Sequence, residues 1–234
     1  MRLPHKTFEK KLFRSGYRRI VAVDEVGMGC LAGPVVVCAV LFNKKFFAKS
    51  HKKLRWLRDS KLLSPKQRET FFQELMRVSG FRFQVCYCRP KTIDRLNIYR
   101  AARTAMRRAV KKLGVRCQVS GVRNIRTPKF NLKSVTCNLK PAIVLVDGKT
   151  KIAGLNMPQV AIVKGDRKVF SIACASLIAK VTRDKMMKNY AEKYPDYGLE
   201  KHKGYGTRFH QAQLATLGPC KIHRKSFAPV ARLL

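Results

Sequence analysis

Acidic residues are scarce in this chain, where 13 Asp and Glu stand against 51 Lys and Arg among 234 residues and the formal net charge is +38. No apolar run approaches the ~18 residues that a membrane-spanning helix needs, which excludes a transmembrane protein. The first residues carry no apolar core of the kind that directs secretion, so we expect a cytoplasmic protein. None of the eight cysteines forms a C-x-x-C pair, which argues against a zinc finger and predicts reduced thiols.

The excess of positive charge predicts a polyanionic partner. The hydrophobic fraction is 46%, so the chain is not a disordered basic tail and has enough apolar residues for a core. Basic side chains gain affinity for nucleic acid by releasing condensed counterions, which makes nucleic acid the expected ligand. No acid occurs from Arg95 to Val146, and within this stretch residues 116–140 are basic and rich in turn residues. We interpret 116–140 as an inserted loop or small hairpin.

Alternating strand-like and helix-like segments predict an α/β fold with a mixed central sheet flanked by helices. Strands are expected at 20–26, 34–42, 81–88, 142–146 and 159–163. Helices are expected at 64–78, 93–113, 170–194 and 208–217. The continuous apolar run at 142–146 favours a central strand covered on both faces. We expect a single domain over residues 1–234 that ends in a helical and loop-like C-terminal region, 195–234.

The few acids gather where predicted strands end. Asp24 and Glu25 end the first strand, Asp147 ends the most apolar one, and Asp166 lies just beyond another. Strand ends commonly build the active site of an α/β sheet. Four carboxylates there would repel one another unless divalent cations neutralise them, and Mg²⁺ or Mn²⁺ prefers oxygen ligands. We therefore predict a two-ion site for phosphodiester hydrolysis. The alternative is that each acid caps a turn or pairs with a lysine.

A collinear series of motifs resembles the type 2 ribonuclease H family (ribonuclease HII). The motifs are DEVGMG (24–29), LAGPVV (31–36), DSKLLSPKQRE (59–69), VDG (146–148), KGD (164–166), SIACASLIAKVTRDKMM (171–187), YGLEKHKGYGT (197–207) and HRKSFAPV (223–230). The resemblance implies a ribonuclease H-like fold and metal-dependent cleavage of RNA paired with DNA. It also implies cleavage at single ribonucleotides in duplex DNA, which leaves a 3′-hydroxyl and a 5′-phosphate. By the same resemblance, the metal ligands are Asp24, Glu25, Asp147 and Asp166.

The resemblance further implies a set of substrate contacts. The backbone of Gly27-Met28-Gly29 would approach the ribose 2′-hydroxyl, the group that separates RNA from DNA. Tyr205 would pack on a neighbouring deoxyribose and Lys61 would contact phosphate, although a loop anchor and a solvated lysine are the plain alternatives. The family usually has Arg where this chain has Met28. We therefore expect weaker substrate binding or relaxed selectivity, with the metal site intact.

Other polar residues of the matching motifs receive structural or surface roles. Asp184 can pair with Lys188 four residues later in a helix, so we interpret it as structural. Metal-activated water needs no catalytic histidine. Surface or phosphate-contacting roles are therefore expected for three histidines of the basic tail: His202, His210 and His223.

The main functional prediction is a monomeric endoribonuclease that acts on RNA–DNA hybrid duplexes with Mg²⁺ or Mn²⁺. Two alternatives stay open. A non-catalytic basic nucleic-acid-binding protein would explain the charge but not the placement of the acids. An activity-impaired relative would keep the fold and the binding; the four intact carboxylates argue against it, whereas Met28 keeps it open.

Overall fold

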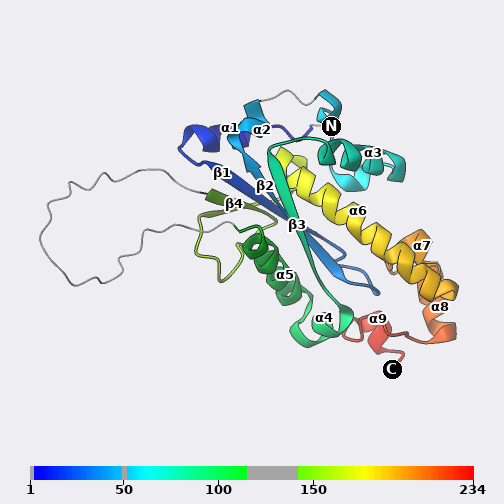
Figure 1. Cartoon of the computed structure of the whole chain (residues 1–234). Helices are drawn as coiled ribbons and strands as arrows, with labels where there is room; N and C mark the ends of the chain where they lie inside the picture. Colours follow the sequence, from blue (N-terminus) through cyan, green and yellow to red (C-terminus); the bar gives the residue numbers. More distant parts are fainter. Residues whose placement is uncertain (1–2, 49–51, 115–141) are drawn as a thin grey trace, which may run out of the picture.

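Five strands form a mixed sheet in the order β3-β2-β1-β4-β5 in the computed structural model of this chain (Figure 1). The structure describes residues 3–48, 52–114 and 142–234, so the predicted insertion at 116–140 lies outside the described residues. The strands are β1 (Arg19–Val26), β2 (Val35–Asn43), β3 (Phe81–Cys88), β4 (Ala142–Asp147) and β5 (Gln159–Ile162). β2 is antiparallel to both β1 and β3, whereas β4 is parallel to both of its neighbours, β1 and β5. The predicted α/β fold with a mixed sheet is therefore confirmed.

Helices surround this sheet and extend beyond one end of it (Figure 1). The α-helices are α1 (Thr7–Arg14), α2 (Lys44–Ala48), α3 (Pro65–Met76), α4 (Pro90–Leu96), α5 (Ile98–Lys112), α6 (Phe170–Lys193), α7 (Leu199–His202), α8 (Arg208–Leu217) and α9 (Ala228–Ala231). Short 3₁₀ turns are η1 (Lys52–Leu54), η2 (Ser60–Leu62), η3 (Gly165–Arg167) and η4 (Pro195–Tyr197). Within the described part of the chain, no helix is long and apolar enough to cross a membrane.

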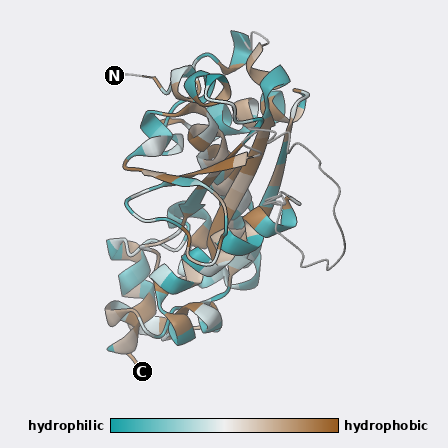
Figure 2. Cartoon of the chain, turned by 90° about the vertical axis from the view of Figure 1, so that its left-hand side faces the viewer, coloured by the Kyte–Doolittle hydropathy of each residue, from teal (hydrophilic) through white to brown (hydrophobic). Residues whose placement is uncertain are grey.

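The two faces of the sheet are covered by different helices because side chains alternate along each strand. In β1, Ile20 and Ala22 pack in the core beneath α6, while Val21 and Val23 pack in the core beneath α5. The apolar strands occupy the interior and polar ribbons lie outside them (Figure 2). β4 is buried on both faces between β1 and β5, as its continuous apolar run predicted.

Three local features differ from the sequence prediction. The helix expected over 93–113 is two helices, α4 and α5, because Asn97 takes a positive φ of 65° and its side chain caps α5 at the Arg100 N–H. The C-terminal region is more helical than expected, with α7 and α9 in addition to α8. At the other end, α1 was not predicted; its buried Glu9 accepts a hydrogen bond from the Ser171 N–H at 2.8 Å.

Candidate active site

The register of two central strands places Asp24 and Asp147 close together. β1 and β4 are parallel, and Val23 is aligned with Val146. The next residue on each strand is therefore Asp24 and Asp147, at the carboxyl ends of neighbouring parallel strands. Asp24 is buried, and its carboxylate accepts a hydrogen bond from the Glu25 N–H at 2.8 Å. The next side chain, Glu25, points to the opposite face because strand side chains alternate.

A contact of Gly165 with Asp147 brings the neighbouring Asp166 close to these carboxylates. The Gly165 N–H donates to Asp147 Oδ1 at 2.7 Å, and Asp166 follows directly in η3, where it is buried. A Cβ atom on Gly165 would lie 2.6 Å from the Ile172 side chain and 3.1 Å from Asp147 Oδ1. Only glycine lets this loop approach the end of β4 so closely.

The pKa values of the carboxyl groups show that they lie within electrostatic reach of one another. Burial raises the pKa of Asp24 well above its usual value, and repulsion from Glu25 and Asp147 adds to the rise. Burial and then repulsion from Asp147 raise the pKa of Glu25 to about 7. The pKa of Asp166 is also raised, first by burial and then by Asp147. The four acids that the sequence selected therefore form one electrostatic cluster.

The donor set of this cluster fits a hard divalent cation. All four groups offer carboxylate oxygens, and Glu25 Oε2 is buried without a hydrogen-bond partner among the described residues. In the described part of the chain, no group of three or more His, Cys, Asp or Glu side chains is yet arranged to hold a metal ion. The carboxylates therefore offer the right chemistry, and would have to move closer together around a bound ion.

Lys61 lies beside the carboxylate cluster. Its positive charge opposes the rise in the pKa of both Glu25 and Asp166. Its side chain is exposed, while its backbone N–H donates to Asp59 Oδ1 at 3.0 Å. Buried Asp59 also accepts a hydrogen bond from Arg167 Nε at 3.0 Å. The loop thus presents an exposed ammonium group within electrostatic reach of the acids.

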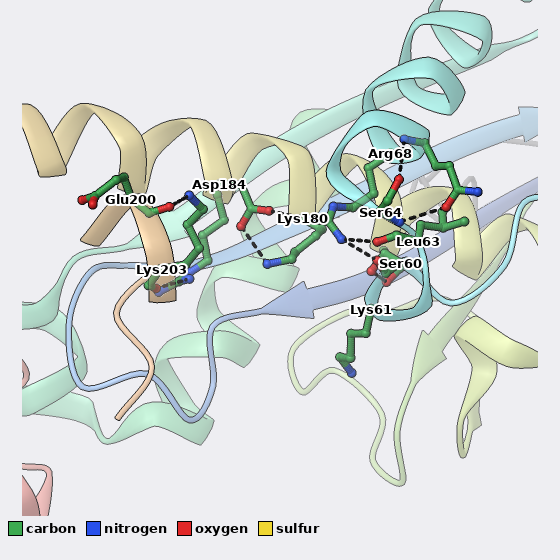
Figure 3. A network of polar contacts seen from close by, with 12 residues as sticks. Ser60, Lys61, Leu63, Ser64, Arg68, Lys180, Asp184, Glu200 and Lys203 are labelled. Carbon is green, nitrogen blue, oxygen red and sulfur yellow. Dashed lines mark hydrogen bonds and ion pairs between the residues drawn. The ribbon is translucent and has the colours of Figure 1, made fainter. Parts of the chain in front are cut away.

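Arg68 ties the η2 loop to α6 (Figure 3). One of its guanidinium nitrogens donates to the Ser60 carbonyl at 3.1 Å, and the other lies 3.5 Å from Asp184 Oδ2. Asp184 has the structural role that we expected, but its helical partner is Lys180, at 2.7 Å, and not Lys188. Asp184 thus contacts α3 and an earlier turn of its own helix.

Two buried arginines bond to the glycine turn and to the segment that follows it, and sequence reasoning missed both. Arg224 donates to the carbonyls of Gly27 at 2.6 Å and Met28 at 3.0 Å. Arg183 donates to the carbonyl of Pro34 at 3.0 Å and to that of Lys203 at 2.9 Å. Both side chains are fully buried, although buried arginine is rare. The available signal was Arg183 itself, a cation on the apolar side of the predicted helix.

Tyr205 lies next to the glycine turn in space. Tyr205 and Cys30 form an antiparallel bridge, and the Leu31 N–H donates to the Gly204 carbonyl at 2.8 Å. The Tyr205 ring is 38% exposed, and the Arg183 guanidinium lies 6.0 Å from its centroid. The structure therefore joins two predicted substrate-contacting segments that are about 175 residues apart in the sequence.

Comparison with known families decides the assignment. The family profile described as Ribonuclease HII matches residues 21–230. The chain belongs to the ribonuclease HII family. It is 42% identical over 219 residues to Ribonuclease HII of Caldicellulosiruptor saccharolyticus, covering 94% of this chain and 91% of that protein. It is 43% identical to Ribonuclease HII of Acholeplasma laidlawii over 234 residues, covering 100% and 99% of the two chains.

Solved structures agree with the family assignment. The structure of an Archaeoglobus fulgidus RNase HII in complex with PCNA matches with a TM-score of 0.63 and 25% identity, over 92% of this chain and 96% of that one. A Bst-RNase HIII in complex with Mn²⁺ matches with a TM-score of 0.65, over 98% of this chain and 73% of that one. At 17% identity, this match supports the fold alone. As a member of this family, the chain is a metal-dependent endoribonuclease that acts on RNA–DNA hybrids. The alternative of a non-catalytic binding protein is not supported.

The surface or phosphate-contacting role expected for the histidines of the basic tail is wrong for two of them. His210 and His223 are buried and hydrogen-bonded to each other at 3.0 Å, so neither is a surface residue that contacts phosphate. His202 is half-buried and stacks on His210 with ring centroids 4.3 Å apart. The basic surroundings in the sequence suggested exposure, but α8 turns His210 inward against the C-terminal segment.

Gly27→Ala should destabilise the protein, whereas Gly29→Ala in the same turn should not. Gly27 has a φ of +93°, and an added Cβ would lie 2.3 Å from buried Arg183 Nε. Gly29 has no atom within 4 Å of an added Cβ. We expect losses in unfolding free energy of about 2–4 kcal/mol for Gly27→Ala and at most about 0.5 kcal/mol for Gly29→Ala. Urea denaturation measures both, and equal losses would contradict this account of the turn.

Proposed function

We propose that this chain cleaves RNA–DNA hybrids, and single ribonucleotides within duplex DNA, by means of divalent ions held at Asp24, Glu25, Asp147 and Asp166. Cleavage would occur on the 5′ side of the ribonucleotide and leave a 3′-hydroxyl and a 5′-phosphate. The observation that carries the proposal is the electrostatic coupling of four carboxylates at neighbouring strand ends in a chain of net charge +38. Such a cluster is costly unless cations neutralise it.

Each residue of the cluster has a task that follows from its contacts. Bound Mg²⁺ or Mn²⁺ would supply Lewis-acid activation of water and of the phosphodiester, in a two-ion arrangement. The Gly165 N–H orients the Asp147 carboxylate through Oδ1 and leaves its other oxygen for an ion. Lys61 and Arg103 lie within electrostatic reach of Glu25 and offset part of its negative charge. The Ser176 side chain lowers the pKa of Asp24 and so favours its ionised form.

The substrate would be read by two segments that are bonded to each other through Cys30 and Tyr205. The Gly27-Met28-Gly29 turn, whose carbonyls are held from behind by Arg224, leaves its exposed side for a ribose 2′-hydroxyl. Tyr205 would pack on the neighbouring deoxyribose, and Lys61 would contact a phosphate. We further propose a monomer that acts as one catalytic domain over residues 1–234, with 195–234 as the substrate-contacting segment.

Cleavage of labelled duplexes tests the proposal. One strand of each substrate contains no ribonucleotide, one ribonucleotide, four ribonucleotides, or ribonucleotides throughout. Each duplex is assayed with Mg²⁺, with Mn²⁺ and with a chelator. With a divalent ion, we expect cleavage of every duplex that contains ribonucleotides, with products that end in a 3′-hydroxyl. With the chelator, we expect no cleavage. Cleavage of the all-DNA duplex, or cleavage that survives chelation, would refute the proposal.

Met28→Arg should strengthen substrate binding and leave the metal requirement unchanged. Met28 is half-buried and packs against the core beneath α5, and it provides no charge to a phosphate. An arginine there is long enough to carry its guanidinium past the half-buried stem into solvent. One added phosphate contact at such a solvated group is worth about two- to fivefold in affinity. The slope of log affinity against log salt should steepen by roughly 0.9. Met28→Gln is the uncharged control, and equal slopes for the two variants would contradict the expected contact.

A further inference from the structure

A pair of buried histidines connects the C-terminal segment to the backbone of Tyr205. His223 Nε2 lies 3.0 Å from His210 Nε2, and His210 Nδ1 lies 2.9 Å from the Tyr205 carbonyl. At the other end, His223 Nδ1 accepts the Cys220 N–H at 3.0 Å. Both rings are at most 2% exposed. Neither histidine touches the carboxylate cluster through any contact described for it, so the metal chemistry does not explain the pair.

The contacts define one proton arrangement for neutral rings. A backbone N–H can only donate, so His223 Nδ1 is the acceptor and the His223 proton sits on Nε2. That proton is donated to His210 Nε2, which leaves the His210 proton on Nδ1, where it is donated to the Tyr205 carbonyl. Burial lowers the pKa of each ring to about 4, so both are neutral at physiological pH. A proton added to His210 Nε2 would face the His223 N–H and break the chain of hydrogen bonds.

The same segment also holds the glycine turn. Arg224, the neighbour of His223, donates to the carbonyls of Gly27 and Met28, and its backbone N–H donates to the Leu31 carbonyl at 2.8 Å. The Gly33 N–H donates to the Ile222 carbonyl at 2.9 Å. Residues 222–224 are therefore bonded on one side to the glycine turn and on the other, through His210, to Tyr205.

We propose that His210 and His223 are positioning residues that set Tyr205 at a defined distance from the Gly27-Met28-Gly29 turn. The inference rests on the proposed function, in which these two segments read a ribonucleotide and the adjoining deoxyribose. A single ribonucleotide in DNA presents both sugars at once, so its recognition depends on that spacing. A long hybrid contains no such junction, so its cleavage depends on the spacing less. The histidine pair thus determines selectivity for the junction and not the chemical step.

Amide substitutions distinguish the two ring nitrogens, because Asn places its amide near Nδ1 and Gln places its amide near Nε2. His210 acts on Tyr205 through Nδ1, so His210→Asn should keep the preference for one ribonucleotide over a long hybrid, while His210→Gln should lower it. His223 acts on His210 through Nε2, so the order should reverse, with His223→Gln mild and His223→Asn severe. The loss of one neutral hydrogen bond predicts a fall of about 3- to 10-fold in the ratio of kcat/KM values.

The Tyr205→Ala background supplies the decisive control. If the histidines act through Tyr205, their substitution should change the ratio by less than about twofold once the ring is absent, since the two changes share one pathway. Thermal denaturation of all variants checks that they fold. If a variant at one position unfolds, the Asn and Gln pair at the other position still tests the inference. The same order at both positions, or additive losses in the Tyr205→Ala background, would overturn the inference. Failure of the native chain to cleave either substrate would instead refute the proposed function.

Discussion

Asp147→Asn should lower cleavage by on the order of 10³-fold or more while duplex binding without metal stays within about twofold of the native chain. Loss of a metal-bound carboxylate removes several kcal/mol of transition-state stabilisation, and each 1.36 kcal/mol is tenfold in rate. Asn keeps the oxygen that accepts the Gly165 N–H, so the loop geometry is retained and only the charge is removed. Single-turnover cleavage and a binding titration on the same duplex measure the two effects.

The same substitution should stabilise the metal-free protein. Asp147 repels Asp24, Glu25 and Asp166, and it contributes to the raised pKa of each. Removing its charge should therefore raise the unfolding free energy at neutral pH by about 0.5–2 kcal/mol, the range that relief of unfavourable charge commonly yields. Asp196→Asn, at an exposed carboxyl far along the chain, is the matched control with the same change in net charge. Persistent cleavage by Asp147→Asn would refute the ligand assignment.

The stabilisation that Mg²⁺ confers should grow as the pH rises through 7. Burial and repulsion raise the pKa of Glu25 from 4.5 to about 7, so the folded metal-free protein binds this proton more tightly than the unfolded chain does. In the metal-free protein, the contribution of protonated Glu25 to the unfolding free energy is therefore fully present below pH 4.5. This contribution is lost as the pH rises through about 7. An ion must displace the proton, so its affinity should rise by up to about tenfold per pH unit below 7 for one displaced proton.

Thermal denaturation between pH 6.5 and 8, with and without saturating Mg²⁺, measures both trends. The buried histidines do not interfere in this window: burial lowers the pKa of His210 and His223 from 6.5 to about 4, so their stabilisation is lost only as the pH falls below 6.5. Glu25→Gln is the control, because it removes the titrating group and should flatten the metal-free curve near pH 7. A Mg²⁺-induced shift in Tm that is equal at both ends of the window would contradict the assignment.

The elements of the fold were predictable where local pattern and burial coincide. β4 before Asp147 and the first half of α6 consist mainly of small and apolar residues, and both are buried. Ser64 followed by Pro65 is also a local signal, and it predicted the start of α3. The structure confirms Ser64 as the N-cap and adds a capping box with Gln67. The break between α4 and α5 was missed because a helical pattern continues across Asn97, and only its positive φ interrupts it.

By itself, the sequence determined the family, the sheet and the four acids of the candidate site, because motifs and strand periodicity are local. Only the tertiary structure decided which residues support that site. The contact of Arg224 with Gly27 spans 197 residues, and the contact between His210 and His223 joins α8 to a segment beyond it. Buried polar groups must find hydrogen-bond partners, but those partners are chosen by the packing of distant segments, which periodicity along one segment does not encode.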